Sequence, residues 1–231
     1  AVMPHVPARL IADKAELERW ILRYRDEADV DQALVLAGGI ATPKGAFGDA
    51  MQLLDTGLFD KHGFTRLHVA GHPEGNRDID PDGGTRAVDA ALAWKTEFAK
   101  RTDAEMAIVT QFAFDAEPVI TWAARIRAAG VDLPVHVGLA GPAKLQTLIK
   151  FAVACGVGPS IAVLKKRAKD LSKLVMPYTP DEVVTDIAAH VASVPDSPIA
   201  GLHIFPLGGI ARSADWMAEN AAPASRLRSR A

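Results

Sequence analysis

The feature of this sequence that most constrains its fold is an alternation of short apolar runs with amphipathic segments. Six runs consist mainly of apolar residues, and two of them end in glycine. The runs cover residues 3–6, 33–39, 66–71, 107–112, 134–139 and 201–206. Short, nearly continuous apolar runs of this kind predict strands whose two faces are both covered.

The segments between the runs have helical periodicity. From Asp13 to Arg25, apolar side chains recur at three- and four-residue steps along one helical face. Asp13 is a candidate N-cap, and Glu16 completes a capping-box pattern three residues later. A second segment, 119–128, repeats the periodicity and is followed by Gly130, where a helix C-cap is expected.

Strands that alternate with helices predict parallel pairing through right-handed crossovers. Either an open, doubly wound sheet or a closed barrel satisfies this pattern. No glycine-rich dinucleotide-binding fingerprint follows the first runs, which weakens the open-sheet alternative. The six runs are also two fewer than the strands of a complete eight-stranded barrel. The periodicity alone therefore leaves both architectures open.

Composition narrows the class of protein. The chain has 231 residues, of which 49% are hydrophobic and 23% charged, so we expect one globular domain over residues 1–220, with a flexible tail over 221–231. The balance of 26 Lys and Arg against 28 Asp and Glu argues against nucleic-acid and anionic-membrane partners. Cys155 is the only cysteine, which excludes an intramolecular disulfide and predicts a cytoplasmic location.

Polar residues and glycines stand in the last part of several apolar runs or directly after them. In a parallel sheet the C-terminal ends of the strands lie at one edge, so these residues are expected to converge there. The set includes His5, Gly38, Gly39, His72, Asn76 and Gln111. For any one of them alone, a capped strand end or a loop residue is the simpler interpretation. Gln111 is the most informative, because its amide can both donate to and accept from the edge of a heterocycle such as a pterin.

Other candidate residues have two interpretations each. Asp115 is either a base or an N-cap, and we favour the cap. His72 with Glu74 suggests a metal pair, but no second histidine stands at ligand spacing, so we expect no metal and favour a hydrogen bond to a cofactor. Phe151 is either a core aromatic, which the pattern favours, or a plate against an aromatic ligand. The Pro/Gly/Asp stretch 78–84 is either a surface loop, which we favour, or a flexible lid over the mouth of a barrel.

Three further histidines stand inside apolar runs rather than after them. His68, His136 and His203 have apolar neighbours in the sequence. We expect them to line a barrel interior as packing or supporting residues.

Taken together, four segments resemble successive landmarks of the methylenetetrahydrofolate reductase family. They are Pro4-His5, Val35-Leu36-Ala37-Gly38-Gly39, His72-Pro73-Glu74 and Thr110-Gln111-Phe112-Ala113-Phe114-Asp115. Their order agrees with the family, and residues 111–151 align with its pattern without a gap. The resemblance implies a parallel (β/α)8 TIM barrel that holds FAD at its mouth. Such an enzyme is reduced by NADH or NADPH and reduces 5,10-methylenetetrahydrofolate to 5-methyltetrahydrofolate in one-carbon metabolism.

The resemblance also assigns roles to residues of this sequence. Gln111 matches the glutamine that contacts the folate, and Phe151 matches the aromatic residue that stacks on the folate or the nicotinamide. His5, Gly38, Ala70 and His72 match positions that line the FAD site, and Lys95 lies near a basic position used for the FAD phosphates. We add Gly39 and Asn76 to this cofactor-binding set, because their turns present donors to phosphate and ring atoms.

The sequence departs from the family in several places. Ala37-Gly38-Gly39 stands where the family usually has Arg-Gly-Asp, and Gly208 or Gly209 replaces an arginine usual after the last strand. Only six of the eight strand–helix units are visible, so we expect a barrel incomplete at its N-terminus. The family's catalytic glutamate belongs to the first strand, which leaves the catalytic residue unassigned.

Two functions follow from this comparison. The first is a divergent flavin-dependent reductase, and the second is a folate- or flavin-binding barrel of the same lineage that acts as a sensor or accessory subunit. The oligomeric state is left open.

Overall fold

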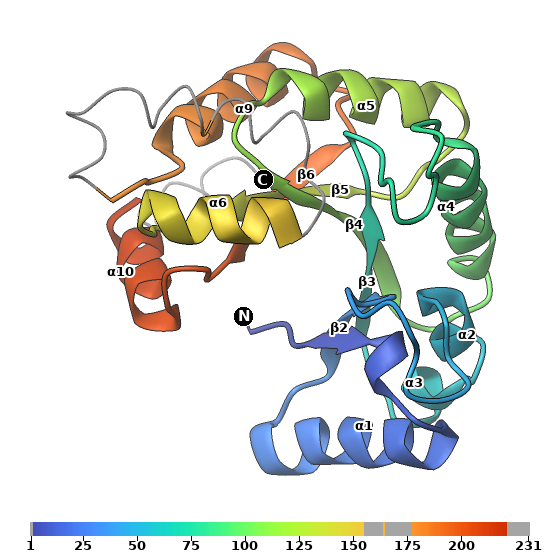
Figure 1. The fold of residues 1–231 in the computed structure, drawn as a ribbon. Helices are drawn as coiled ribbons and strands as arrows, with labels where there is room; N and C mark the ends of the chain where they lie inside the picture. The colour runs from blue at the N-terminus through green and yellow to red at the C-terminus, as the bar shows by residue number, and fades with distance from the viewer. Residues whose placement is uncertain (1, 155–163, 165–176, 221–231) are drawn as a thin grey trace, which may run out of the picture.

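The computed structural model describes residues 2–154, 164 and 177–220, so Cys155 and the expected tail 221–231 lie outside the described residues. The fold is α/β, with one sheet of six parallel strands that alternate with helices (Figure 1). The strands are β1 (His5–Pro7), β2 (Gln32–Leu36), β3 (Arg66–Gly71), β4 (Glu105–Ala113), β5 (Val135–Ala140) and β6 (Ile199–Phe205). The helices are the 3-10 turn η1 (Ala8–Leu10), α1 (Lys14–Ala28), α2 (Ala50–Leu54), α3 (Leu58–Lys61), α4 (Arg86–Phe98), α5 (Glu117–Ala128), α6 (Leu145–Ala154), α9 (Asp181–Ser193) and α10 (Ile210–Asn220).

The order of the strands in the sheet is the order in the sequence, β1-β2-β3-β4-β5-β6, as predicted. The run 66–71 coincides with β3, and the other predicted runs differ from their strands by a few residues at the ends. β1 is an edge strand that pairs only with β2, which confirms the expected position of the first run.

The eight-stranded barrel is not confirmed, because the sheet is not closed. Among the described residues, β1 and β6 form the two edges and are not hydrogen-bonded to each other. The sheet nevertheless curls until side chains of its two edges meet. The ring of His5 lies 5.7 Å from that of His203 and 5.6 Å from that of Phe205, centroid to centroid. The rings of His5, His203 and Phe205 thus separate β1 from β6, and the two edges are not paired through backbone hydrogen bonds. Hydrogen-bonded strands lie closer together, at about 4.8 Å.

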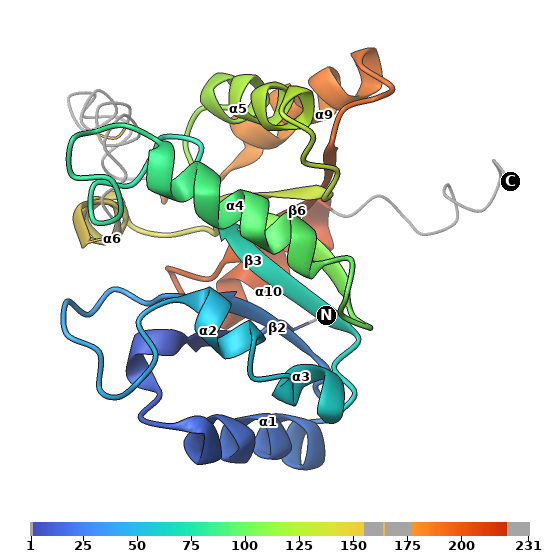
Figure 2. The same cartoon turned by 90° about the vertical axis from the view of Figure 1, so that its right-hand side faces the viewer.

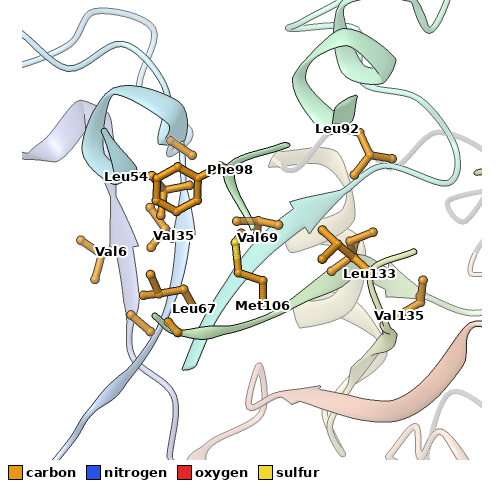
Figure 3. Close-up of a cluster of buried hydrophobic side chains, with 14 of the residues drawn as sticks. Val6, Val35, Leu54, Leu67, Val69, Leu92, Phe98, Met106, Leu133 and Val135 are labelled. Atoms are coloured by element: carbon orange, nitrogen blue, oxygen red, sulfur yellow. The ribbon is translucent and has the colours of Figure 1, made fainter. Parts of the chain in front are cut away.

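The helices α1, α2, α4 and α5 lie in succession along the outer side of the curled sheet (Figures 1 and 2). Right-handed crossovers between strands in sequential order place the connecting helices on one face of the sheet. Side chains of successive strands, among them Val6, Val35 and Val69, form a buried cluster with Leu54 of α2 and Phe98 of α4 (Figure 3). This cluster is the main hydrophobic core.

The two faces of the strands differ in composition. In β3, Leu67 and Val69 belong to the outer core, whereas the alternate residues Arg66 and His68 line a cavity on the inner side. Side chains alternate between the faces of a strand, so the same segment supplies apolar residues to one side and polar residues to the other. The outer face of β3 therefore packs into the apolar core, and its inner face is partly polar.

The predicted local signals at the helix ends are confirmed. The Asp13 side chain accepts a hydrogen bond from the Glu16 backbone N–H at 2.7 Å, and the Glu16 carboxylate accepts from the Ala12 N–H at 2.6 Å. Gly130 follows α5 with a φ of +86°, a conformation that favours glycine. In the described part of the chain, no helix is long and apolar enough to cross a membrane.

Candidate functional site

The C-terminal ends of β3 and β4 bring four of the predicted site residues together. We define the edge cluster as Ala70, His72, Lys95 and Gln111. Ala70 lies near the end of β3, His72 directly follows this strand, and Gln111 lies near the end of β4. Lys95 projects from α4, and its Nζ donates a hydrogen bond to the Ala70 carbonyl oxygen at 2.9 Å.

Lys95 is a buried cation. Its side chain is only 6% exposed, and burial lowers the pKa of Lys95 to about 8, while the charge of Asp49 acts in the opposite direction. Asp49 is the N-cap of α2, where its carboxylate accepts a hydrogen bond from the Gln52 N–H at 3.0 Å. Lys95 is therefore largely protonated at neutral pH. Its positive charge lies beside the C-terminal end of β3, next to the Ala70 carbonyl oxygen.

His72 is neutral at the same pH. Burial and the nearby charge of Lys95 lower the pKa of His72 to about 4, and a hydrogen bond with the Gln111 side chain opposes this shift. The Nδ1 atom of His72 is buried and has no hydrogen-bond partner. A buried polar atom without a partner costs about 1–3 kcal/mol, so a ligand atom that pairs with it would bind favourably.

A β-bulge sets the position of Gln111. The register between β4 and β5 shifts between Val109 and Phe112. Within the bulge, the Thr110 hydroxyl donates to the Gln111 carbonyl oxygen and accepts from the Gly138 N–H, each at 2.8 Å. Bulges re-aim side chains at strand ends, and this one turns the Gln111 amide toward His72.

Sequence reasoning did not identify Thr110 or Asp49 as parts of the site. Thr110 is buried inside an apolar run, and no periodicity signals a bulge there. The Asp49-x-x-Gln52 spacing does predict a helix start, but not its proximity to Lys95.

The turn after β2 lies at the same end of the sheet. Gly38 has a φ of +92°, and a Cβ atom there would stand 3.0 Å from the Pro7 Cβ. At Gly39, by contrast, a Cβ would meet nothing within 4 Å. The positive φ and the nearby Pro7 side chain therefore favour glycine at position 38, whereas a side chain at position 39 would have room.

Three predicted residues lie apart from the edge cluster or serve another purpose. His5 begins β1 and contacts His203 and Phe205 on the inner side of the sheet. Asn76 organises its own loop, because its Oδ1 accepts from the Asp78 N–H at 2.9 Å. Phe151 is 38% exposed on α6 and is not part of the core that the pattern favoured.

The burial pattern of α6 explains the exposure of Phe151. Leu148 and Ala152 form its buried stripe, and successive residues of a helix point about 100° apart. Phe151 is thereby turned away from the core.

Two further expectations are resolved by the geometry of the loops. The N-cap of α5 is Ala116 rather than the predicted Asp115, which stands one residue earlier and accepts a hydrogen bond from the Glu117 N–H at 3.1 Å. In the loop 78–84, the buried Asp80 accepts from the backbone N–H groups of Ala87 and Val88 at the start of α4. The loop is thus anchored at its centre.

The arginine usual after the last strand has no room at one of its two candidate positions. A Cβ at Gly208 would stand 1.9 Å from the Pro142 carbonyl oxygen. Any side chain there would displace the backbone of the turn after β5.

Within the described residues, no group of histidines, cysteines and acids is arranged to hold a metal ion. The sequence matches no protein-family model. The arrangement at the end of β3 and β4 therefore supplies the chemical argument: a neutral imidazole, a carboxamide and a buried ammonium group meet at one edge of the sheet.

Proposed function

We propose that this protein binds FAD and a folate at the C-terminal edge of its sheet. The proposed reaction is the reduction of 5,10-methylenetetrahydrofolate to 5-methyltetrahydrofolate with NADH or NADPH as reductant. The observation that carries the proposal is the edge cluster, because it joins the buried Lys95 to the half-buried polar side chains of His72 and Gln111 where a parallel sheet usually binds its ligands.

The residues of the edge cluster fit a planar heterocycle with several polar atoms. His72 offers a buried Nδ1 that has no protein partner, and the Gln111 amide offers both a donor and an acceptor. Lys95 contributes a positive charge that favours electron-rich ring atoms nearby. Bound FAD would supply hydride transfer between the nicotinamide and the folate. The protein would hold the rings, exclude water and stabilise negative charge.

The resemblance gives each residue a place in this arrangement. Gln111 would hold the pterin, with Phe151 as an aromatic surface for the folate or nicotinamide. Ala70, His72 and Gly38 would line the FAD, and Lys95 would support it electrostatically. Phe151 is exposed enough to offer a face to a ligand.

One observation favours a second function. The turn after β2 reads Ala37-Gly38-Gly39 and contributes no carboxylate or guanidinium group to this edge. Without a charge there to tune the flavin, the same site would bind a folate or flavin as a sensor or accessory subunit. The two functions share the ligands and differ in turnover.

Anaerobic spectroscopy of the purified protein with added FAD separates these functions. For the reductase, we expect NADH or NADPH to bleach the flavin absorbance and methylenetetrahydrofolate to restore it. Binding of FAD or folate without bleaching by either nucleotide would favour the second function. A protein that binds neither FAD nor folate in equilibrium dialysis would contradict both.

A further inference from the structure

A cavity on the inner side of the sheet is lined by histidines. It has a volume of about 710 Å³, and its polar lining comprises Gln32, Arg66, His68, Glu105, His136 and His203. Gln32, Arg66 and Glu105 begin β2, β3 and β4, so the cavity opens at the N-terminal ends of the strands. It therefore lies at the opposite end of the sheet from the edge cluster. Its volume is within the range of small-molecule sites.

The imidazole rings in and beside this cavity lie close together. The rings of His68 and His136 are 4.6 Å apart, and that of His203 is 5.7 Å from His5, centroid to centroid. Each comes from a different strand, so the curl of the sheet creates the group.

One buried nitrogen atom of His68 has no hydrogen-bond partner in the protein. Its side chain is only 7% exposed, and its Nδ1 has no hydrogen-bond partner. His68 is one of the residues that line the cavity.

The charged residues that line the cavity form an ion pair at its opening. Arg66 stands at the opening, and Glu105 is the one acidic residue among the described lining residues. The Glu105 carboxylate lies 3.3 Å from the Arg66 Nε, and its side chain is 81% exposed, so it faces solvent rather than the interior. The Arg66 side chain is 55% exposed as well, so the polar groups that line the interior are the imidazoles of His68, His136 and His203.

We propose that this inner-face cavity is an oxyanion site whose occupancy is coupled to proton uptake by His68, His136 and His203. Its ligands are small molecules that carry a phosphate, sulfate or carboxylate group. The negative oxygens accept hydrogen bonds from the protonated imidazoles and from the Arg66 guanidinium group. This site is independent of the function proposed above.

Burial of the imidazoles, together with their mutual repulsion, explains the coupling. Burial, followed by the charges of neighbouring histidines, lowers the pKa of His68 and of His203 to about 4. The pKa of His136 is also lowered by burial and by Arg66, and that of His5 by burial. The empty site is therefore uncharged at its imidazoles near neutral pH. An anion relieves the repulsion, raises these pKa values and is bound more tightly as the pH falls.

Calorimetric titration with sodium sulfate tests the proposal, since sulfate keeps both charges across this pH range. Ionic strength is matched with chloride. We expect binding to be about tenfold tighter or more at pH 5.5 than at pH 7.5, as uptake of one proton allows up to tenfold per pH unit. The variant His203→Asn should lose part of this pH dependence, because only His68 and His136 then remain to take up protons. The control His190→Gln, on α9 away from the cavity, should keep it.

Binding that does not change with pH, or the same pH dependence in His203→Asn, would overturn the proposal. If His203→Asn does not fold, imidazole NMR of the unmodified protein decides. Sulfate should raise the pKa of His68, His136 and His203, and unchanged values for all three would overturn the proposal. A shift with phosphate or succinate in place of sulfate would show which oxyanion the site prefers.

Discussion

Gln111 joins two environments, because its backbone lies in the β-bulge and its side chain pairs with His72. Its identity as a candidate followed from its position after an apolar run. The β-bulge that orients the Gln111 side chain could not be predicted, because Thr110 has the sequence pattern of an ordinary buried strand residue. A sequence shows which side chains are available at a strand end, but their direction depends on hydrogen bonds across the sheet.

We predict that Gln111→Ala weakens folate affinity or turnover by about ten- to a hundredfold, equivalent to roughly 1–3 kcal/mol, because the ligand would lose its amide partner. Stopped-flow measurement of the two half-reactions should show less effect on flavin reduction by NADH or NADPH. Gln32→Ala, at the opposite end of the sheet, is the matched control. Equal damage to both half-reactions would indicate a structural role, and no damage would remove the support for a folate contact.

Lys95 gives a prediction about stability at alkaline pH. Its folded pKa of about 8 lies below the ordinary value of 10.5, so the unfolded chain binds the additional proton between these values. The free energy of unfolding should therefore rise by up to about 3 kcal/mol between pH 8 and 10.5 through this residue. Urea denaturation of Lys95→Met should lack this increment, while the exposed-lysine control Lys100→Met should retain it. Equal slopes in both variants would contradict the buried charge.

At the scale of elements, the turn after β2 allows a matched pair of substitutions. Gly38→Val introduces a side chain at a φ of +92° and beside Pro7, whereas Gly39→Val enters open space. We predict that Gly38→Val lowers the free energy of unfolding by about 1–3 kcal/mol and reduces FAD occupancy. Absorbance and urea denaturation measure the two effects. If Gly38→Val keeps its full flavin content, the cofactor does not approach this turn.

The elements differ in how well local sequence determines them. The cap of α1 follows from Asp13 and Glu16, which lie within one turn of each other, and the end of α5 follows from Gly130. The prediction of β1 was less accurate: the apolar run covers residues 3–6, whereas the strand covers His5–Pro7. Its pairing with β2 decides where the strand begins. His5 thus became an inner residue rather than a residue at the C-terminal edge.

For the whole molecule, the parallel pairing of the strands was predictable from the alternation of strands and helices, whereas the closure of the sheet was not. Alternation of strands and helices limits the pairing to parallel neighbours, but closure depends on two edges that are distant in the sequence. The resemblance supplied the expectation of an eight-stranded barrel, whereas the described residues form an open sheet of six strands.

The buried histidines predict that the protein is sensitive to acid. The pKa values of His68, His72 and His203 are each lowered to about 4, so the unfolded chain binds more protons between pH 4 and 6.5. Stability should therefore fall as the pH decreases through this range. After allowance for partial solvent screening, we expect a loss on the order of 3 kcal/mol between pH 7 and 5. Urea denaturation at the two pH values measures it, and unchanged stability would show that these imidazoles are protonated as readily as in the unfolded chain.

The contact of His5 with His203 and Phe205 has a consequence for the order of folding. Each strand pairs only with its neighbours in sequence, so pairing can propagate along the chain from one unit to the next. The His5 contact spans nearly the whole described chain, and closing so long a loop is costly before the intervening strands are in place. It should be among the last contacts to form and the first to open. The imidazole of His5 would then act as a reporter that distinguishes a fully assembled molecule from one that has only paired its strands.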